Sequence, residues 1–221
     1  MGGLLRAGMA EFLAARAVPG VESVLGGVYR RTISLDGARG VLEGPPPGGD
    51  DHLILRAHLP YWEGLIHVVE RVSRMVGTDA DAHQGAAHLA ADPAIGPLVS
   101  ARPGIRVPGA WGAPEVAVHA LVAQDCGLPE ASARLGALAR ASGPPVPGLT
   151  HGLTHLFPSP ETIAGEDLTV TGIPSRAAEP VRELRSPGRS WRMAAGPLAR
   201  ITRSRRASRP SLTRSRPLTT G

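Results

Sequence analysis

The stretch 21–43, V-E-S-V-L-G-G-V-Y-R-R-T-I-S-L-D-G-A-R-G-V-L-E, decides the fold of the first half of the chain. Its first part, residues 21–34, is rich in β-branched side chains, which fit a pleated strand. Asp36-Gly37 predicts a hairpin turn, because glycine adopts a positive φ at no steric cost. We therefore predict that residues 40–43 form the antiparallel return strand of this hairpin.

Helical patterns lie on both sides of the hairpin. Residues 8–17 place apolar side chains on one face, and Pro19-Gly20 ends the pattern. After a loop rich in proline and glycine, residues 52–56 predict a further strand. Five apolar residues then recur at three- and four-residue spacing, which predicts a helix that packs on the sheet. They are Trp62, Leu65, Val69, Val72 and Val76.

Strand signals fade after residue 100, and the rest of the patterned sequence is helical. Pro114 and Pro129 each predict the first turn of a helix, where a proline loses no hydrogen bond. Ser159 and Ser175 are the predicted N-caps of two later helices. The order of these patterns indicates an α+β fold, with a mixed α/β piece first and helices after it.

The composition excludes several kinds of chemistry. The 221 residues include one cysteine and neither lysine nor asparagine. A single cysteine excludes a disulfide framework and a thiolate zinc cluster within the chain. The absence of lysine excludes a phosphate-loop lysine and a lysine Schiff base. No apolar run reaches the roughly 18 residues of a transmembrane helix, so we expect no membrane association and a cytoplasmic location.

The net charge of +5 is an average over two unlike parts. Residues 1–184 hold 14 arginines against 19 acidic residues, whereas residues 185–221 hold ten arginines and no acid. The second part is also rich in serine, threonine and proline and poor in aromatic residues. That composition is typical of disorder, so we predict a disordered basic tail.

The common catalytic and metal-binding patterns are weak here. His151 and His155 are four residues apart, as a metal pair on a helix would be, but they lie in a loop rich in glycine and proline. Cys126 lies near the end of an apolar helix and is interpreted as a buried packing residue rather than a nucleophile. We therefore expect no metal and no cofactor.

Three segments carry a family resemblance. They are F-L-A-A-R-A-V-P-G-V-E at 12–22, S-A-R-P-G-I-R-V-P-G at 100–109 and L-T-H-L-F-P-S-P-E-T-I-A at 153–164. Together they resemble the DNA-3-methyladenine glycosylase II family, the alkylation-repair branch of the helix-hairpin-helix DNA glycosylases. The resemblance implies an N-terminal mixed α/β domain with a twisted antiparallel sheet, followed by an all-α glycosylase domain.

The resemblance also implies a function and a partner. Family members are monofunctional glycosylases of base excision repair, which flip an alkylated base out of double-stranded DNA and hydrolyse its N-glycosidic bond. By resemblance, Phe12 lines the base pocket, and Gln124 precedes the wedge that fills the gap in the base stack. The wedge position is Asp125 here, and a carboxylate there is repelled by phosphates. A monomer is expected.

The resemblance stops before the catalytic segment. Neither the family's hairpin motif, similar to L-P-G-I-G-x-W-T-A, nor the catalytic Asp after it occurs up to Gly221. We therefore expect a truncated, inactive glycosylase. It would have an α/β domain over 1–100, an incomplete helical domain over 101–184 and the tail over 185–221. An incomplete domain would leave apolar faces around residues 115–140 uncovered.

The tail has two interpretations. In a GC-rich gene, residues 185–195 can be encoded so that a shifted frame reads V-A-R-A-L-V-A-D-G-R, which suits the helix and turn of the family at that place. One hypothesis is therefore a reading frame lost near Leu184. The alternative is a genuine tail, whose ten arginines make the protein a non-catalytic DNA-binding module.

Overall fold

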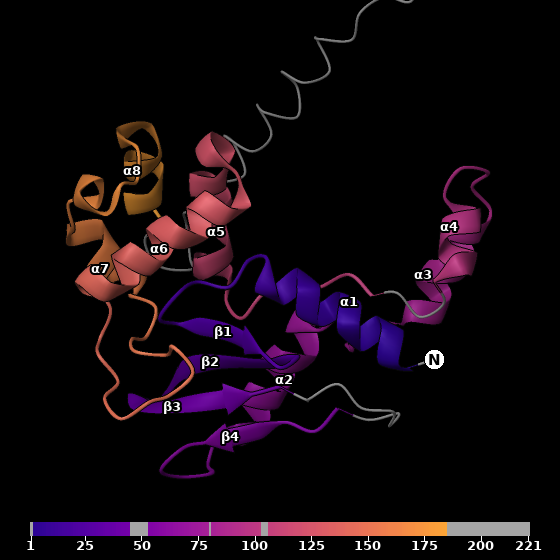
Figure 1. The fold of residues 1–221 in the computed structure, drawn as a ribbon, viewed down its shortest axis with the longest axis horizontal. Coiled ribbons are helices and arrows are strands. Elements are labelled where there is room, and N and C mark those ends of the chain that lie inside the picture. The colour runs from indigo at the N-terminus through magenta and orange to yellow at the C-terminus, as the bar shows by residue number, and fades with distance from the viewer. Residues whose placement is uncertain (1, 45–52, 80, 103–105, 185–221) are drawn as a thin grey trace, which may run out of the picture. The chain divides into compact units, whose positions relative to one another are not determined.

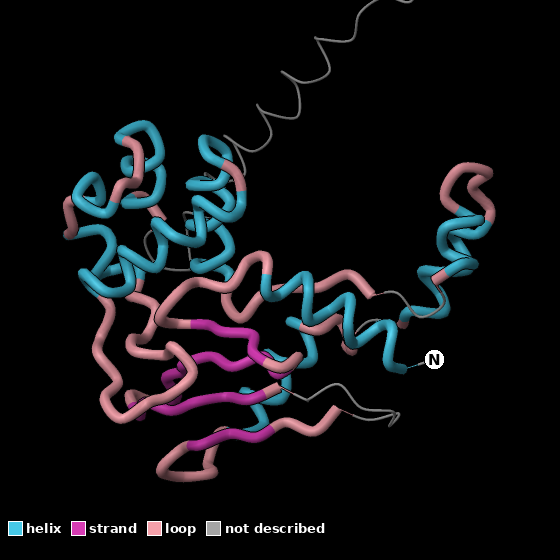
Figure 2. Tube along the Cα trace, viewed as in Figure 1, coloured by secondary structure: helices cyan, strands magenta, loops and turns pink. Residues whose placement is uncertain are grey.

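The computed structural model describes residues 2–44, 53–79, 81–102 and 106–184, which all belong to one structural unit (Figures 1 and 2). The predicted loop at 45–49 and the predicted disordered tail at 185–221 lie outside the described residues. Within the described part, no helix is long and apolar enough to cross a membrane.

A four-stranded antiparallel sheet forms the first layer. Its strands are β1 (Glu22–Leu25), β2 (Val28–Leu35), β3 (Ala38–Glu43) and β4 (Arg56–His58), in that spatial order. The predicted hairpin is confirmed: Leu35 pairs with Ala38, and both turn residues, Asp36 and Gly37, have positive φ of 48° and 85°. A two-residue turn of this kind matches the twist of the strands that it joins.

The strand predicted over 52–56 is wrong in position, because β4 begins only at Arg56. Glu43, the last residue of β3, pairs with Arg56. Residues before Arg56 therefore lie beyond the end of β3 and have no strand to pair with. Leu53 and Ile54 are exposed as a result.

Helix α2 (Leu65–Met75) covers one face of the sheet. Its Val68 packs in a core cluster with Ile33, Leu42 and Trp111. Met75, seven residues later in the same helix, is also buried. The predicted core face was therefore wrong in part: Trp62 is 78% exposed, and Leu65 and Val69 are also exposed. Apolar residues lie all around the first turns of α2. Apolar side chains therefore recur at three- and four-residue spacing on two different faces of the helix.

Helix α1 (Gly2–Ala14) lies against β1 and β2 and begins earlier and ends earlier than the predicted range 8–17. Two helices that no sequence pattern predicted, α3 (Ala82–Ala90) and α4 (Gly96–Ala101), pack on each other.

The second half is helical, as predicted. It contains α5 (Ala113–Cys126), α6 (Leu128–Ser142), α7 (Pro160–Gly165), a short 3₁₀ helix η1 (Leu168–Thr171) and α8 (Ser175–Arg182). Pro114 and Pro129 lie in the first turns of α5 and α6. The Ser159 cap is confirmed, since its Oγ accepts a hydrogen bond from the Thr162 amide at 3.2 Å. The Ser175 cap is wrong: Pro174 precedes α8, and no side chain caps it.

The apolar faces of α5 and α6 are covered within the chain. Val118, Val122, Leu135 and Leu138 are all buried. Helix α8 packs on α5, and η1 packs on α6, so the short C-terminal elements replace water on these faces. The expectation that these faces are left open is therefore wrong for these side chains, whereas Val116 and Leu128 of the same helices are exposed.

Candidate functional site

A buried ion-pair cluster joins the sheet to the first turn of α5. Arg31 of β2 is only 2% exposed, and its Nη2 donates to both carboxylate oxygens of Glu115, each at 2.9 Å. Its Nη1 donates to Glu22 at 3.2 Å. The Tyr29 hydroxyl donates to the same Glu22 carboxylate. Two carboxylates therefore compensate one buried guanidinium, which is the condition for keeping a charge out of water.

The cluster shifts the acidity of its members. Burial raises the pKa of the Tyr29 hydroxyl well above its usual value, and the neighbouring Glu22 carboxylate adds to that shift. Burial also raises the pKa of the Glu115 carboxyl, although the Arg31 guanidinium opposes this. Each of these groups has a partner inside the cluster, so the arrangement is suited to holding the two halves together.

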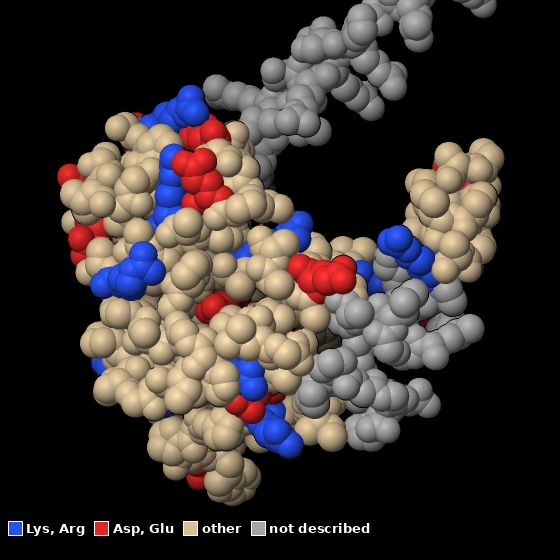
Figure 3. Space-filling model, in the orientation of Figure 1, with Lys and Arg blue, Asp and Glu red and all other residues tan. Residues whose placement is uncertain are grey.

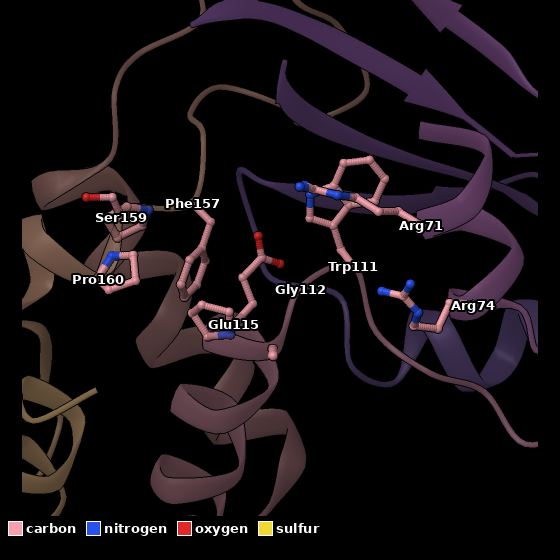
Figure 4. Close-up of a pocket in the computed structure, with 11 residues that line it drawn as sticks. Arg71, Arg74, Trp111, Gly112, Glu115, Phe157, Ser159 and Pro160 are labelled. Carbon is pink, nitrogen blue, oxygen red and sulfur yellow. The ribbon is translucent and has the colours of Figure 1, made fainter. Parts of the chain in front are cut away.

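A cavity of about 410 Å³ opens beside this cluster (Figure 4). Arg71 and Arg74 project from α2 on one side, and Phe157 stands on the opposite side in the loop before α7. Trp111 and Glu115 form the wall between them. The remaining lining residues are Gly112, Ala113, Pro114, Pro158, Ser159 and Pro160.

Two arginine side chains lie close to the Trp111 ring. The Arg31 guanidinium carbon lies 4.6 Å from the ring centroid, and that of Arg71 lies 5.3 Å from it. Both distances fall within the range of a cation–π interaction, which orients the ring and the Arg71 side chain together. The Arg74 carbonyl accepts a hydrogen bond from the Gly77 amide at 3.2 Å, whereas its guanidinium has no hydrogen-bond or ion-pair partner in the part of the chain that the structure describes.

The residues predicted from the family resemblance lie on two different helices. Phe12 is half-buried on α1, and the Arg16 guanidinium lies 3.6 Å from its ring centroid. Gln124 and Asp125 lie near the end of α5, where Gln124 is exposed. The Asp125 carboxylate is paired with Arg176 of α8 at 2.7 Å. This ion pair was not predicted, because nothing in the local sequence connects residues 51 positions apart.

The histidine pair predicted to be weak is not on a helix. His151 adopts a positive φ of 58° in a turn, and His155 follows in an extended segment. The four-residue spacing therefore does not place the two rings on one helical face. Among the described residues, no group of three potential metal ligands comes together.

Sequence reasoning missed Arg31, Glu115 and Trp111 as a site. Alternation along β2 was the available signal, since it places Arg31 on the face of Tyr29 and Ile33, which are both buried. The partner Glu115 lies 84 residues later, and sequence spacing alone does not reveal such a contact.

Solved structures that are similar to this chain include DNA glycosylases. A 3-methyladenine DNA-glycosylase from Archaeoglobus fulgidus is similar with a TM-score of 0.69 and 20% identity, over 83% of this chain and 64% of that chain. MBOgg1, solved in complex with a low-affinity DNA ligand, has a TM-score of 0.56 and 16% identity, over 86% of this chain and 58% of that one. The described residues therefore have the fold of a DNA glycosylase.

The sequence narrows this class to one family. Residues 4–112 match the AlkA N-terminal domain. A "Probable bifunctional transcriptional activator/DNA repair enzyme AlkA" of Mycobacterium tuberculosis is 34% identical over 177 residues, which is 80% of this chain and 35% of the relative. The DNA-3-methyladenine glycosylase 2 of Escherichia coli is 28% identical over 77% of this chain and 59% of the relative. Residues 4–112 are therefore an AlkA N-terminal domain, and the similarity to DNA-3-methyladenine glycosylases continues beyond it, which confirms the resemblance; the chain spans about a third of the first relative.

Proposed function

We propose that this chain binds alkylated double-stranded DNA in base excision repair without itself hydrolysing the N-glycosidic bond. The observation that carries the proposal is the end of α5, where Gln124 is exposed and Asp125 is half-buried. By resemblance, these two residues would lie where the family fills the base stack. Phe12 would line the pocket for the flipped base. The division into a domain over 1–100 and a helical domain over 101–184 is part of this proposal.

The charge of the described part supports weak rather than tight DNA binding. Residues 1–184 carry more acidic than basic side chains, and on the face drawn in Figure 3 the two signs are interspersed over the described residues. Phosphate neutralisation by arginine supplies most of the non-specific affinity of a DNA-binding protein. The exposed arginines, which include Arg176, would therefore make the phosphate contacts of this part.

The ion pair between Asp125 and Arg176 lowers that affinity further. Arg176 is 71% exposed in its side chain and therefore accessible to a phosphate, but Asp125 already engages its guanidinium at 2.7 Å. A phosphate has to compete with this carboxylate, and Asp125 repels it at the same time. The pair would thus oppose DNA at the turn that, by resemblance, enters the base stack.

The proposed absence of cleavage has a chemical reason. Hydrolysis of an N-glycosidic bond needs a carboxylate that stabilises the cationic sugar of the transition state. Glu22 and Glu115, the carboxylates of the buried cluster, are both engaged by Arg31. Residues 185–221 contain no Asp or Glu. A lysine-dependent lyase route is excluded as well, because the chain has no lysine.

The test is DNA affinity as a function of the charge at residue 125. Fluorescence anisotropy with a methylated duplex at low salt should show several-fold tighter binding for Asp125→Asn, because one repulsive charge is removed and Arg176 is released. Arg176→Gln should bind more weakly. Glu161→Gln, with the same charge change on α7, is the control and should bind nearly as the parent does. Equal gains for Asp125→Asn and Glu161→Gln would place the DNA elsewhere.

We further propose a monomer in the cytoplasm. Sedimentation of the purified chain, alone and with duplex, checks the first part: one chain per particle is expected in both samples.

A further inference from the structure

We propose that the cavity between α2 and the loop before α7 is a nucleotide-binding site, which takes a phosphate on Arg71 and Arg74 and a planar base on Phe157. The proposal does not depend on the proposed function, because the cavity contains none of Phe12, Gln124 and Asp125. At about 410 Å³, the cavity lies within the range of small-ligand sites.

The charges lining the cavity leave an excess of positive charge. Arg71 and Arg74 both line it, whereas the one lining carboxylate, Glu115, is bound bidentately by Arg31. Figure 4 shows both arginine side chains reaching from α2 toward the space in front of Trp111. Two guanidinium groups one helical turn apart match a phosphate, which accepts several hydrogen bonds from such donors. A cationic ligand would be repelled from this wall.

The opposite wall suits a flat ring. Phe157 is half-buried, and in Figure 4 its ring stands across the space from the arginines. Pro158 and Ser159 follow in the same loop, and Pro160 begins α7. Bases stack on aromatic side chains without regard to sequence, because every base has a π-face. Trp111 is 8% exposed and already held by Arg31 and Arg71, so it forms a fixed floor rather than a stacking partner.

The chemistry recognised is therefore a phosphate joined to a base. Free nucleotides and a DNA strand both carry this unit, and they differ in how binding responds to chain length. The probes are dAMP, inorganic phosphate and a short single-stranded oligonucleotide, titrated into the full chain by calorimetry. A separate NMR titration follows the indole Nε1–H signal of Trp111, which is assigned with the Trp111→Phe variant. A shift of this signal reports that the ligand enters this cavity.

The first variant removes the arginine wall. Arg71→Gln/Arg74→Gln should weaken dAMP binding by about tenfold or more, because two charge-assisted hydrogen bonds are lost. Arg56→Gln/Arg140→Gln removes the same charge from exposed positions outside the cavity and should leave the affinity unchanged. Arg71 and Arg74 are exposed, so the fold should persist, which circular dichroism checks.

A second pair of variants differs in the charge that it adds to the cavity, while both variants supply an N-cap side chain to α5. Gly112 precedes α5 in an extended conformation with φ of −149°, and a Cβ there would meet only Pro114 Cδ, at 3.8 Å. Asp and Asn are both good N-cap residues, so Gly112→Asp and Gly112→Asn should both fold. Gly112→Asp should abolish dAMP binding by neutralising the arginines, whereas Gly112→Asn should retain it.

The outcomes separate the sources of the ligand. Binding of dAMP assigns the site to free nucleotides, and binding of the oligonucleotide alone, with the same dependence on Arg71 and Arg74, assigns it to a strand. The proposal is overturned if neither binds, if the Trp111 signal does not move, or if the arginine variant and its control bind equally. Inorganic phosphate as tight as dAMP would overturn the role of Phe157.

Discussion

At the scale of single residues, Arg31 connects the two halves of the chain. Its guanidinium donates to Glu22 of β1 and to Glu115 of α5, and its cation–π contact with the Trp111 ring adds a third link. A buried ion pair contributes little net stability compared with an apolar contact of the same size, but removing one partner leaves uncompensated charge in the interior. The cluster is therefore sensitive to single substitutions.

Arg31→Gln should lower the free energy of unfolding by about 3–5 kcal/mol, because Glu22 and Glu115 then lose their counter-charge. Urea denaturation at neutral pH measures this. The matched control is Arg56→Gln on the exposed strand β4, for which a change within about 0.5 kcal/mol is expected. A loss below about 1 kcal/mol for Arg31→Gln would show that water reaches the carboxylates and that the cluster does not hold the sheet and α5 together.

Some features of single residues could be predicted from the sequence, and others could not. The turn at Asp36-Gly37 could be predicted because its conformation depends on the two residues themselves. The burial of Arg31 follows from strand alternation once β2 is placed. Its pairing with Glu115 depends on how α5 docks on the sheet, and no local pattern contains that information.

At the scale of elements, α6 packs closely against the segment that leads into β1. A Cβ on Gly136 would meet the Pro19 carbonyl oxygen at 2.9 Å and two atoms of the Pro19 ring at 3.0 and 3.1 Å. The obstacle is backbone and a rigid ring, which cannot move aside as a flexible side chain would. Glycine is therefore required in the middle of α6 by packing, against its low helix propensity.

Gly136→Ala separates these two effects. Alanine is the better helix former by about 1 kcal/mol, but overpacking costs roughly 1–3 kcal/mol, so net destabilisation is expected. Gly85→Ala in α3 is the control, because nothing lies within 4 Å of its Cβ and only the propensity gain remains. Thermal unfolding of the two variants should shift in opposite directions; stabilisation by both would mean that α6 is not packed on Pro19.

The contact between α5 and α6 should also respond to pH. Burial lowers the pKa of His119 on α5, which lies 3.4 Å from the Ser132 hydroxyl of α6. The unfolded chain binds a proton near the ordinary value of 6.5, whereas the folded chain binds it only at lower pH. Stability is therefore present above about pH 6.5 and is lost as the pH falls through the lowered pKa. His119→Gln should remove this component from the pH profile of unfolding; an unchanged profile would contradict it.

Elements differ in how far sequence could place them. The starts of α5, α6 and α7 were predictable, because proline in the first turn and the Ser159 cap are local signals. The buried face of α2 was not, because apolar residues surround its first turns and only contact with the sheet selects Val68. The position of β4 depends on where β3 ends, which is a tertiary constraint.

At the scale of the whole molecule, the described residues reproduce the fold of a DNA glycosylase across 83% of the chain, compared with the Archaeoglobus fulgidus enzyme. The same alignment covers 64% of that enzyme. The family's hairpin motif and catalytic Asp are not found in the 221 residues. The packed elements of this fold are therefore present over the described residues, and we propose that the chain binds DNA without cleaving the glycosidic bond.

The most direct measurement is release of 3-methyladenine from methylated DNA by the purified 221-residue chain, with the Escherichia coli relative as the positive control. Anisotropy on the same duplex establishes that the DNA is bound under the assay conditions. We predict binding with no base release above the protein-free background. Release that increases with protein concentration and persists over many turnovers would contradict the account, because it would require a catalytic carboxylate that we have not identified.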